Sequence, residues 1–175
     1  MRRLILTGAP GCGKTTILRA LAAMGHAVVE EAATDVIARA HGAGDLEPHT
    51  RPGFIDEILA MQRRRQIEAP PAAIQFFDRS PVCTHALSVF LGYPASRALT
   101  AELARIERDE IYQRRMLFIE TLGFVEPTAA RRITFAESVA FERVHEESYR
   151  LFGYELVRIP AGPLAGRVHR VLAVG

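Results

Sequence analysis

Short apolar runs alternate along the chain with longer stretches in which apolar residues recur at helical spacing. The apolar runs predict strands and the stretches between them predict helices, as in β–α units around a mostly parallel sheet. Strands are expected at residues 3–7, 27–30, 74–78, 116–120 and 154–159. Helices are expected at residues 14–24, 32–41, 53–67, 82–91, 96–108, 134–151 and 164–173. The pattern therefore predicts an α/β fold.

The best-defined helix start is Thr134, because Thr134 and Glu137 have the spacing of a capping box. Loops are expected at residues 42–52, at residues 121–133 and directly after Asp78. No internal repeat or shift in composition marks a boundary, so residues 1–175 are expected to form one domain.

Residues 8–15 read Gly-Ala-Pro-Gly-Cys-Gly-Lys-Thr between a strand and a helix, which is the phosphate-binding P-loop pattern in its required context. Glycines let backbone N–H groups curl around phosphate oxygens, and the following helix adds its partial positive charge. Lys14 is expected to reach the β and γ phosphates, and the Thr15 hydroxyl to bind Mg²⁺. The alternative, a glycine turn that only joins two elements, does not explain the complete pattern. The expected nucleotide-binding residues are Gly8, Ala9, Pro10, Gly11, Cys12, Gly13, Lys14, Thr15 and Thr16.

Asp78 ends an apolar run and is expected at the carboxyl edge of its strand, facing the same crevice as the P-loop. There its carboxylate would hold Mg²⁺, directly or through water, or accept a proton as a general base. The alternative is a strand-end aspartate that caps the next helix.

The residue after this acid separates classes of P-loop protein. Hydrolytic AAA motors carry a water-activating glutamate there, whereas this chain has Arg79, which offers donors to phosphate and no base. A Ras-like GTPase is excluded, because its base-reading motif needs an asparagine and the chain contains none. Arg79 therefore favours phosphoryl transfer or nucleotide binding.

Arg131 and Arg132 lie in residues 121–133, where a lid would bring guanidinium groups onto a transferring phosphate. The alternative is a solvated pair beside Glu126 or Glu137.

Glu30 and Glu31 end the second strand and open toward the same crevice, where they would bind hydroxyls of an acceptor molecule; a helix-start acid is the alternative for Glu31. Gln62 is expected to point inward toward a substrate. Residues 63–65 are three consecutive arginines, which a helix spreads around its circumference, so a mainly solvated face is expected.

Composition changes this picture little. The formal net charge is +2 and the sequence pI is about 8.8, which gives no general case for nucleic acid. No apolar run approaches the length of a membrane span or a signal peptide, so a cytoplasmic location is expected. The histidines lack ligand spacing, so no metal other than Mg²⁺ is expected.

These residues resemble a family, the small NadR-like P-loop proteins of the AAA-domain group, which are similar in layout to the ribosylnicotinamide-kinase module and, more distantly, to deoxynucleoside kinases. The resemblance covers nearly the whole chain and rests on residues 6–16, 28–33, 62, 76–80, 149–157 and 159–160. Thr34 departs from it, since many relatives carry arginine there, and this leaves the identity and charge of an acceptor open.

The resemblance implies a three-layer P-loop NTPase fold with a five-stranded parallel sheet in the order 2-3-1-4-5. It also implies Lys14 and Thr15 on phosphates and Mg²⁺, Glu31 near an acceptor, Asp78 as base with Arg79 on phosphates, and Arg131 or Arg132 as the lid arginine. The predicted function is transfer of the γ-phosphoryl group of MgATP to a small nucleoside-like hydroxyl compound. The alternative is a nucleotide-dependent switch that hydrolyses slowly and acts on a protein or lipid partner.

Overall fold

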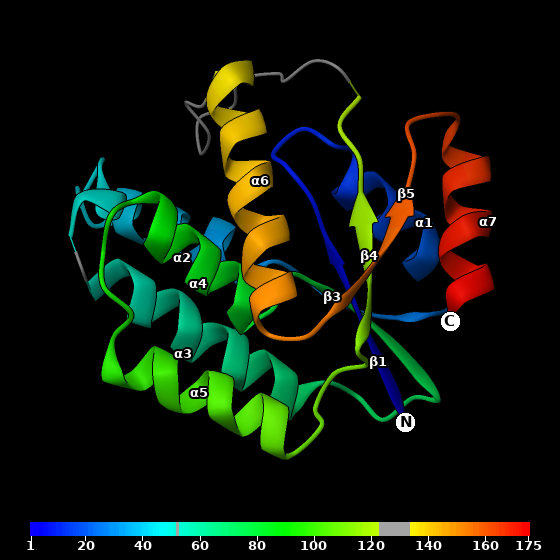
Figure 1. Ribbon diagram of the computed structural model, residues 1–175, viewed down its shortest axis with the longest axis horizontal. Coiled ribbons are helices and arrows are strands. Elements are labelled where there is room, and N and C mark those ends of the chain that lie inside the picture. Colours follow the sequence, from blue (N-terminus) through cyan, green and yellow to red (C-terminus); the bar gives the residue numbers. More distant parts are fainter. Residues whose placement is uncertain (52, 123–133) are drawn as a thin grey trace.

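The computed structural model describes residues 1–51, 53–122 and 134–175 (Figure 1). Its strands are β1 (Arg2–Thr7), β2 (Ala27–Val29), β3 (Ile74–Asp78), β4 (Arg115–Ile119) and β5 (Glu155–Ile159). All neighbouring strands pair in parallel, in the order β2-β3-β1-β4-β5. The α/β fold, the parallel sheet and its predicted strand order are confirmed.

The helices also lie where the apolar periodicity predicts them. They are α1 (Lys14–Ala23), α2 (Ala32–Gly42), α3 (Gly53–Glu68), α4 (Pro81–Phe90), α5 (Arg97–Arg108), α6 (Phe135–Leu151) and α7 (Leu164–Val174). Only a short 3₁₀ helix, η1 (Pro48–Thr50), was not foreseen; it lies in the expected loop at residues 42–52. The capping box is confirmed, because Thr134 Oγ1 accepts from the Glu137 N–H while a Glu137 carboxylate oxygen accepts from the Thr134 N–H.

Both faces of the sheet are covered, which explains why its strands are apolar in succession instead of alternating with polar residues. Side chains of a strand point to opposite faces in turn. Leu4 and Leu6 of β1 therefore pack with α1 and α7, while Ile5 packs with α3, α4, α5 and α6. Figure 1 shows α1 and α7 together on one side of the sheet and the larger group of helices on the other. α2 packs against α3 in a separate apolar cluster.

The strand order places the ends of β1 and β3 side by side. In the register of this pair, Leu6 lies opposite Asp78, so the segment that follows β1 starts beside the last residue of β3. The strand order reverses here, and ligands of open α/β sheets bind outside the carboxyl ends of the strands at such a point. In the three described segments, no helix has the length and apolar character needed to cross a membrane.

Candidate active site

The loop between β1 and α1 has the backbone curl that its glycines allow. Gly8, Gly11 and Gly13 adopt positive φ values of 149°, 82° and 80°, which residues with a Cβ rarely adopt. Space is also restricted at Gly8, where a Cβ would lie 2.3 Å from the carbonyl oxygen of Ile119. The loop is thus held close to the end of β4, and α1 begins directly at Lys14.

Lys14 and Asp78 form a buried ion pair at the mouth of the sheet. Lys14 Nζ lies 2.9 Å from Asp78 Oδ1, and the two side chains are 4% and 5% exposed. Burial, the largest influence, would lower the pKa of Lys14, but the negative charges of Asp78 and Glu31, with a smaller effect of Cys12, together outweigh it, so the pKa is raised and the ammonium stays charged. The pairing follows from topology, because Lys14 comes from the loop after β1 and Asp78 ends the neighbouring strand.

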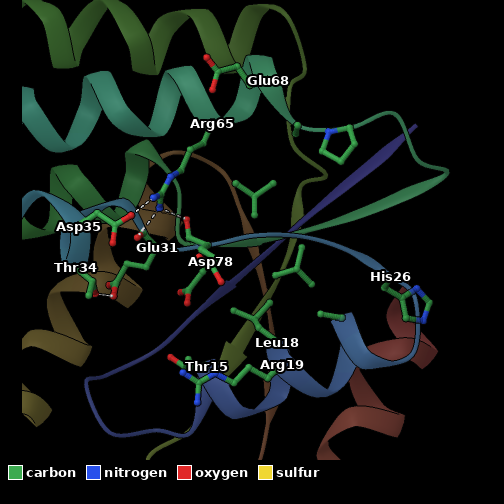
Figure 2. Close-up of a pocket in the computed structure, with 16 residues that line it drawn as sticks. Thr15, Leu18, Arg19, His26, Glu31, Thr34, Asp35, Arg65, Glu68 and Asp78 are labelled. Carbon is green, nitrogen blue, oxygen red and sulfur yellow. Dashed lines mark hydrogen bonds and ion pairs between the residues drawn. The ribbon is translucent and has the colours of Figure 1, made fainter.

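Asp78 Oδ1 is buried and makes no hydrogen bond among the described residues, so its contact with Lys14 is an ion pair only. The exposed Thr15 lines the same cleft as Asp78 (Figure 2). A carboxylate and a hydroxyl are the kind of oxygen ligands that Mg²⁺ takes beside nucleotide phosphates. The described residues include no group of three or more His, Cys, Asp or Glu able to hold a metal alone. Thr15 and Asp78 therefore fit Mg²⁺ that also binds phosphate oxygens.

The helix after β3 is capped by Ser80 and not by Asp78. Ser80 Oγ accepts a hydrogen bond from the Val82 N–H at 3.3 Å. The same oxygen lies 2.7 Å from the Tyr149 hydroxyl, which is also 3.1 Å from Cys83 Sγ. Because Ser80 supplies the cap, the carboxylate of Asp78 is left for the ion pair with Lys14, and the alternative role predicted for Asp78 as a helix cap is wrong.

Arg79 is held from two sides. Its Nε donates to a Glu31 carboxylate oxygen at 2.5 Å, and its Nη1 donates to His145 Nε2 at 2.8 Å. Its backbone adopts φ 72°, and its N–H donates to the Leu6 carbonyl. Burial, the largest influence, would lower the pKa of the guanidinium, but the charge and hydrogen bond of Glu31, together with Cys83 and Asp78, outweigh it and the net shift is upward.

Glu31 therefore faces the site, as predicted, and does not cap the helix that follows it. It occupies the N-cap position of α2 without a side-chain cap hydrogen bond. Its carboxylate binds Arg79 and also accepts from Thr34 Oγ1 at 2.7 Å. Thr34 thus orients the acid that precedes it by three positions.

His145 was missed by the sequence interpretation. It lies on α6 and is fully buried, and its Nδ1 lies 2.9 Å from the Phe141 carbonyl oxygen. Since a carbonyl only accepts, Nδ1 carries the proton, and Nε2 is free to accept from Arg79. Burial, reinforced by the charge of Arg79, lowers the pKa of His145 to about 3. The signal was its spacing, four residues after Phe141 and four before Tyr149, which places it on the buried stripe of the helix.

Arg65 departs from the mainly solvated face expected of residues 63–65, whereas Arg63 and Arg64 are exposed as predicted. Arg65 Nη1 donates to the carbonyl oxygens of Glu30 and Glu31 at 2.9 and 2.7 Å, and its Nη2 binds the Asp35 carboxylate. The contact joins α3 to the end of β2. Arg65 lies seven residues after the buried Ile58 and therefore on the same face of the helix, which is a signal that the run of arginines obscured.

Of these residues, Glu31, Thr34, Asp35, Arg65 and Asp78 line one end of a cleft of about 750 Å³ (Figure 2). Figure 2 shows Asp78, Glu31 and Arg65 above the start of α1, with Thr15 and Arg19 below them. The cleft continues along the exposed edge of β2 toward His26. Gln62 does not line it: its Nε2 donates to the Ser80 carbonyl at 3.2 Å and its Oε1 accepts from Thr84 Oγ1 at 2.7 Å. Arg131 and Arg132 lie outside the described residues.

Arg167 of α7 donates hydrogen bonds to the P-loop and to the residue after β4. No pattern in the sequence indicated these contacts of Arg167. Its Nη1 donates to the Cys12 carbonyl at 2.8 Å, and its Nη2 donates to the Glu120 carbonyl at 3.1 Å. The residue is 4% exposed. A Cβ on Gly13 would lie 2.9 Å from Nη1, so the arginine and the glycine fit one another. Arg167 thus ties the loop to the end of β4.

A family model described as an AAA domain matches residues 3–167. Among curated proteins, no sequence matches the chain.

Solved structures share the fold. The chain is similar to NadR in complex with NAD and AMP-PNP, with a TM-score of 0.69 and 17% identity over 99% of this chain and 48% of that one. NadR in complex with NR gives a TM-score of 0.67 and 19% identity over 99% and 50%. Deoxyadenosine kinase from M. mycoides with bound dATP gives 0.61 and 12% over 98% of both chains. The chain therefore spans about half the length of the NadR structures, and likeness at these identities shows the fold alone.

Replacing Arg167→Met should destabilise the protein, because the carbonyls of Cys12 and Glu120 lose their buried donors. At about 1 to 3 kcal/mol for each unsatisfied group, the free energy of unfolding in urea should fall by about 3 kcal/mol. Arg170→Met is the matched control, since Arg170 is exposed on the same helix and should shift stability by less than about 0.5 kcal/mol. Equal, small effects in both variants would contradict the role of Arg167.

The depressed pKa of His145 should make folding sensitive to acid. The unfolded imidazole takes up a proton near its ordinary pKa of 6.5, whereas the folded one resists protonation down to about 3. Stability is therefore fully present above about pH 6.5 and is lost as the pH falls toward about 3, with a slope near 1.4 kcal/mol per pH unit.

Urea unfolding of the wild type and of His145→Gln measures this term. From about pH 7 to about pH 5, the wild type should lose about 2 kcal/mol more than the variant, which cannot titrate at position 145. Parallel pH profiles would show that His145 is not held neutral.

Proposed function

The chain belongs to this AAA-domain family, and we propose that it binds MgATP at residues 8–16 and transfers the γ-phosphoryl group to a hydroxyl of a small nucleoside-like molecule. The observation that carries the proposal is the buried Lys14–Asp78 pair, because Asp78 also lines a cleft together with Thr15 and Glu31. The NadR structure is a complex with AMP-PNP and the deoxyadenosine kinase structure is a complex with dATP, which supports a nucleoside triphosphate as the ligand here.

Lys14 and the N–H groups of the P-loop would hold the phosphates. The positive φ values at Gly11 and Gly13 turn the backbone into a concave loop, and such loops bind anions with their N–H groups. Lys14 starts α1, so it adds its ammonium to the partial charge of the helix N-terminus. When the triphosphate binds, Lys14 would exchange part of its contact with Asp78 for phosphate oxygens.

Thr15 and Asp78 would hold Mg²⁺, which supplies positive charge to the phosphate oxygens when bound. The buried Asp78 Oδ1 contacts the Lys14 ammonium at 2.9 Å and has no hydrogen bond among the described residues, so Mg²⁺ would share this oxygen with Lys14, directly or through water. The second role open to Asp78 is that of proton acceptor.

In the transfer step, the acceptor oxygen forms a bond to the γ-phosphorus while the bond from that phosphorus to the β–γ bridging oxygen breaks. The bridging oxygen leaves with the electron pair as part of ADP, and the hydroxyl proton passes to a carboxylate in the cleft. Arg79 and the arginines at positions 131 and 132 would neutralise charge on the moving phosphoryl group. Glu31 would bind a hydroxyl of the acceptor, while Gln62, which is engaged by Ser80 and Thr84, would have to exchange these contacts to meet it.

The charge of the cleft favours an acceptor that carries no phosphate. Its lining includes five acids and two arginines: Glu30, Glu31, Asp35, Glu68 and Asp78 against Arg19 and Arg65. Four of these acids also pair with cations: Glu31 with Arg79, Asp35 with Arg65, Glu68 with Arg64 and Asp78 with Lys14. The acids still outnumber the cations in the lining itself. A phosphorylated acceptor would approach these carboxylates with like charge. A neutral or cationic alcohol would meet no such repulsion.

A screen with [γ-³²P]ATP and Mg²⁺ should therefore label a nucleoside or related alcohol and leave the matching 5′-monophosphates unlabelled. Thin-layer chromatography separates labelled acceptor from free phosphate. Release of free phosphate alone, at a rate that no compound in the panel alters, would overturn the kinase proposal and favour the nucleotide-dependent switch.

Replacing Asp78→Asn should abolish phosphoryl transfer and leave MgATP affinity within about threefold, because an amide cannot accept the proton while the P-loop still holds the phosphates. Asp109→Asn is the control, since Asp109 is exposed at the end of α5, away from the cleft. Turnover measures the first effect and calorimetry measures the second. Equal loss of affinity and turnover would assign Asp78 to Mg²⁺ binding and not to proton transfer.

A further inference from the structure

Arg79 occupies a backbone conformation that needs support from its surroundings. Its φ of 72° lies in the left-handed region, which residues with a Cβ enter at a cost in free energy. Such conformations persist only where neighbouring contacts determine them, and they gather at functional sites. One contact is the hydrogen bond from the Arg79 N–H to the Leu6 carbonyl at 3.0 Å, and the others involve the guanidinium.

The guanidinium lies between an acid and a neutral acceptor. Glu31 binds its Nε, and His145 Nε2 accepts from Nη1 on the other side. The Arg79 and Glu31 side chains are 9% and 12% exposed, so this pairing takes place largely out of water.

The imidazole is itself fixed. Its Nδ1–H donates to the Phe141 carbonyl one helical turn earlier, and its ring packs on the Phe141 ring with centroids 4.2 Å apart. Both nitrogens of His145 are therefore used, one to hold the ring on α6 and the other to receive Arg79. The ring is fully buried, so water does not compete for either hydrogen bond.

A neutral acceptor has a consequence that a carboxylate would not have. Glu31 already offsets the charge of Arg79, and a second acid at position 145 would leave the group with a net negative charge beside the phosphate site. An imidazole orients the guanidinium without adding charge, so the cation keeps its capacity to stabilise a phosphoryl group.

We propose that His145 is a positioning residue for Arg79. Its Nε2 accepts a hydrogen bond from Arg79 Nη1 and so holds the guanidinium against Glu31, which lines the cleft. The importance of this orientation for turnover rests on the proposed phosphoryl transfer, whereas the orientation itself can be tested without it. His145 belongs to α6, so the helix that follows residues 123–133 sets the geometry at the end of β3.

Two variants separate the hydrogen bond from the packing. His145→Phe keeps a ring and removes the acceptor, whereas His145→Gln keeps an acceptor at a similar reach and removes the ring. His85→Phe is the control. His85 lies on α4 and contacts Ser148 of α6 and Phe152, and it does not contact Arg79. All are made in the full chain.

Nuclear magnetic resonance of the ¹⁵N-arginine-labelled protein tests whether the guanidinium stays held against Glu31, because the Arg79 Nε–H donates to that acid; its signal is assigned by its loss in Arg79→Lys. Its exchange with water should be slow in the wild type, His145→Gln and His85→Phe, and at least about tenfold faster in His145→Phe, where the guanidinium loses a fixed partner. Unchanged exchange in His145→Phe would overturn the proposal. If that variant does not fold, the wild-type imidazole decides: a proton on Nε2 in long-range ¹H–¹⁵N spectra at about pH 6 contradicts the geometry, and a proton on Nδ1 alone supports it.

Turnover gives the second readout, with the acceptor that the ³²P screen labels. His145→Phe should lower kcat about 10²-fold, because a displacement of a catalytic group by about 1 Å costs roughly that much in rate. The affinity for MgATP should stay within about twofold of the wild-type value. His145→Gln should recover most of this loss. Equal losses in both variants, or a parallel fall in MgATP affinity, would indicate a merely structural role. If no compound is labelled, the proposed function fails while the exchange measurement still decides the role of His145.

Discussion

The site depends on one constraint: Lys14 and Asp78 are buried charges that must stay together. An isolated charge in a protein interior is costly, whereas a pair 2.9 Å apart in the same environment is tolerated. The pair forms because β1 and β3 are neighbouring strands in the sheet. Asp78 is the last residue of β3, and Lys14 comes at the end of the loop that follows β1. The sheet order, the glycine-rich loop and the acid at the end of β3 are therefore linked, since moving any one of them would leave a charge buried without its partner.

Three arginines extend this arrangement outward. Arg79 pairs with Glu31, Arg65 fastens the end of β2 to α3, and Arg167 ties the P-loop to β4. Helix α6 completes the frame: Ser138 donates to the Pro10 carbonyl, and His145 receives Arg79. Arginine suits these positions because its planar fork serves two acceptors at once. The loop and the edges of the cleft are thus held by fixed hydrogen bonds, which is how a site prepared for phosphate charge should be built.

The sequence predicted the fold well because its signals are local. Short, mainly apolar runs such as residues 74–78 are typical of buried strands. Both ends of every expected element lie within one residue of the observed bounds. The P-loop and Asp78 were found because motif and strand end coincide. Arg65, His145 and Arg167 escaped notice because their partners are far away in the chain, 34, 66 and 155 residues for their contacts with Glu31, Arg79 and Cys12. No local pattern reports such pairings, although helical spacing marked Arg65 and His145 as inward-facing.

The chain contains 21 arginines and a single lysine, and this lysine lies where a compact ammonium must reach between phosphates. A lysine-directed acyl-phosphate derivative of ATP therefore has one side-chain target, and peptide mass spectrometry locates the modification. We expect acylation of Lys14 that excess MgATP blocks. Absence of labelling at Lys14, or labelling that MgATP does not diminish, would contradict the assignment of this site to nucleotide phosphates.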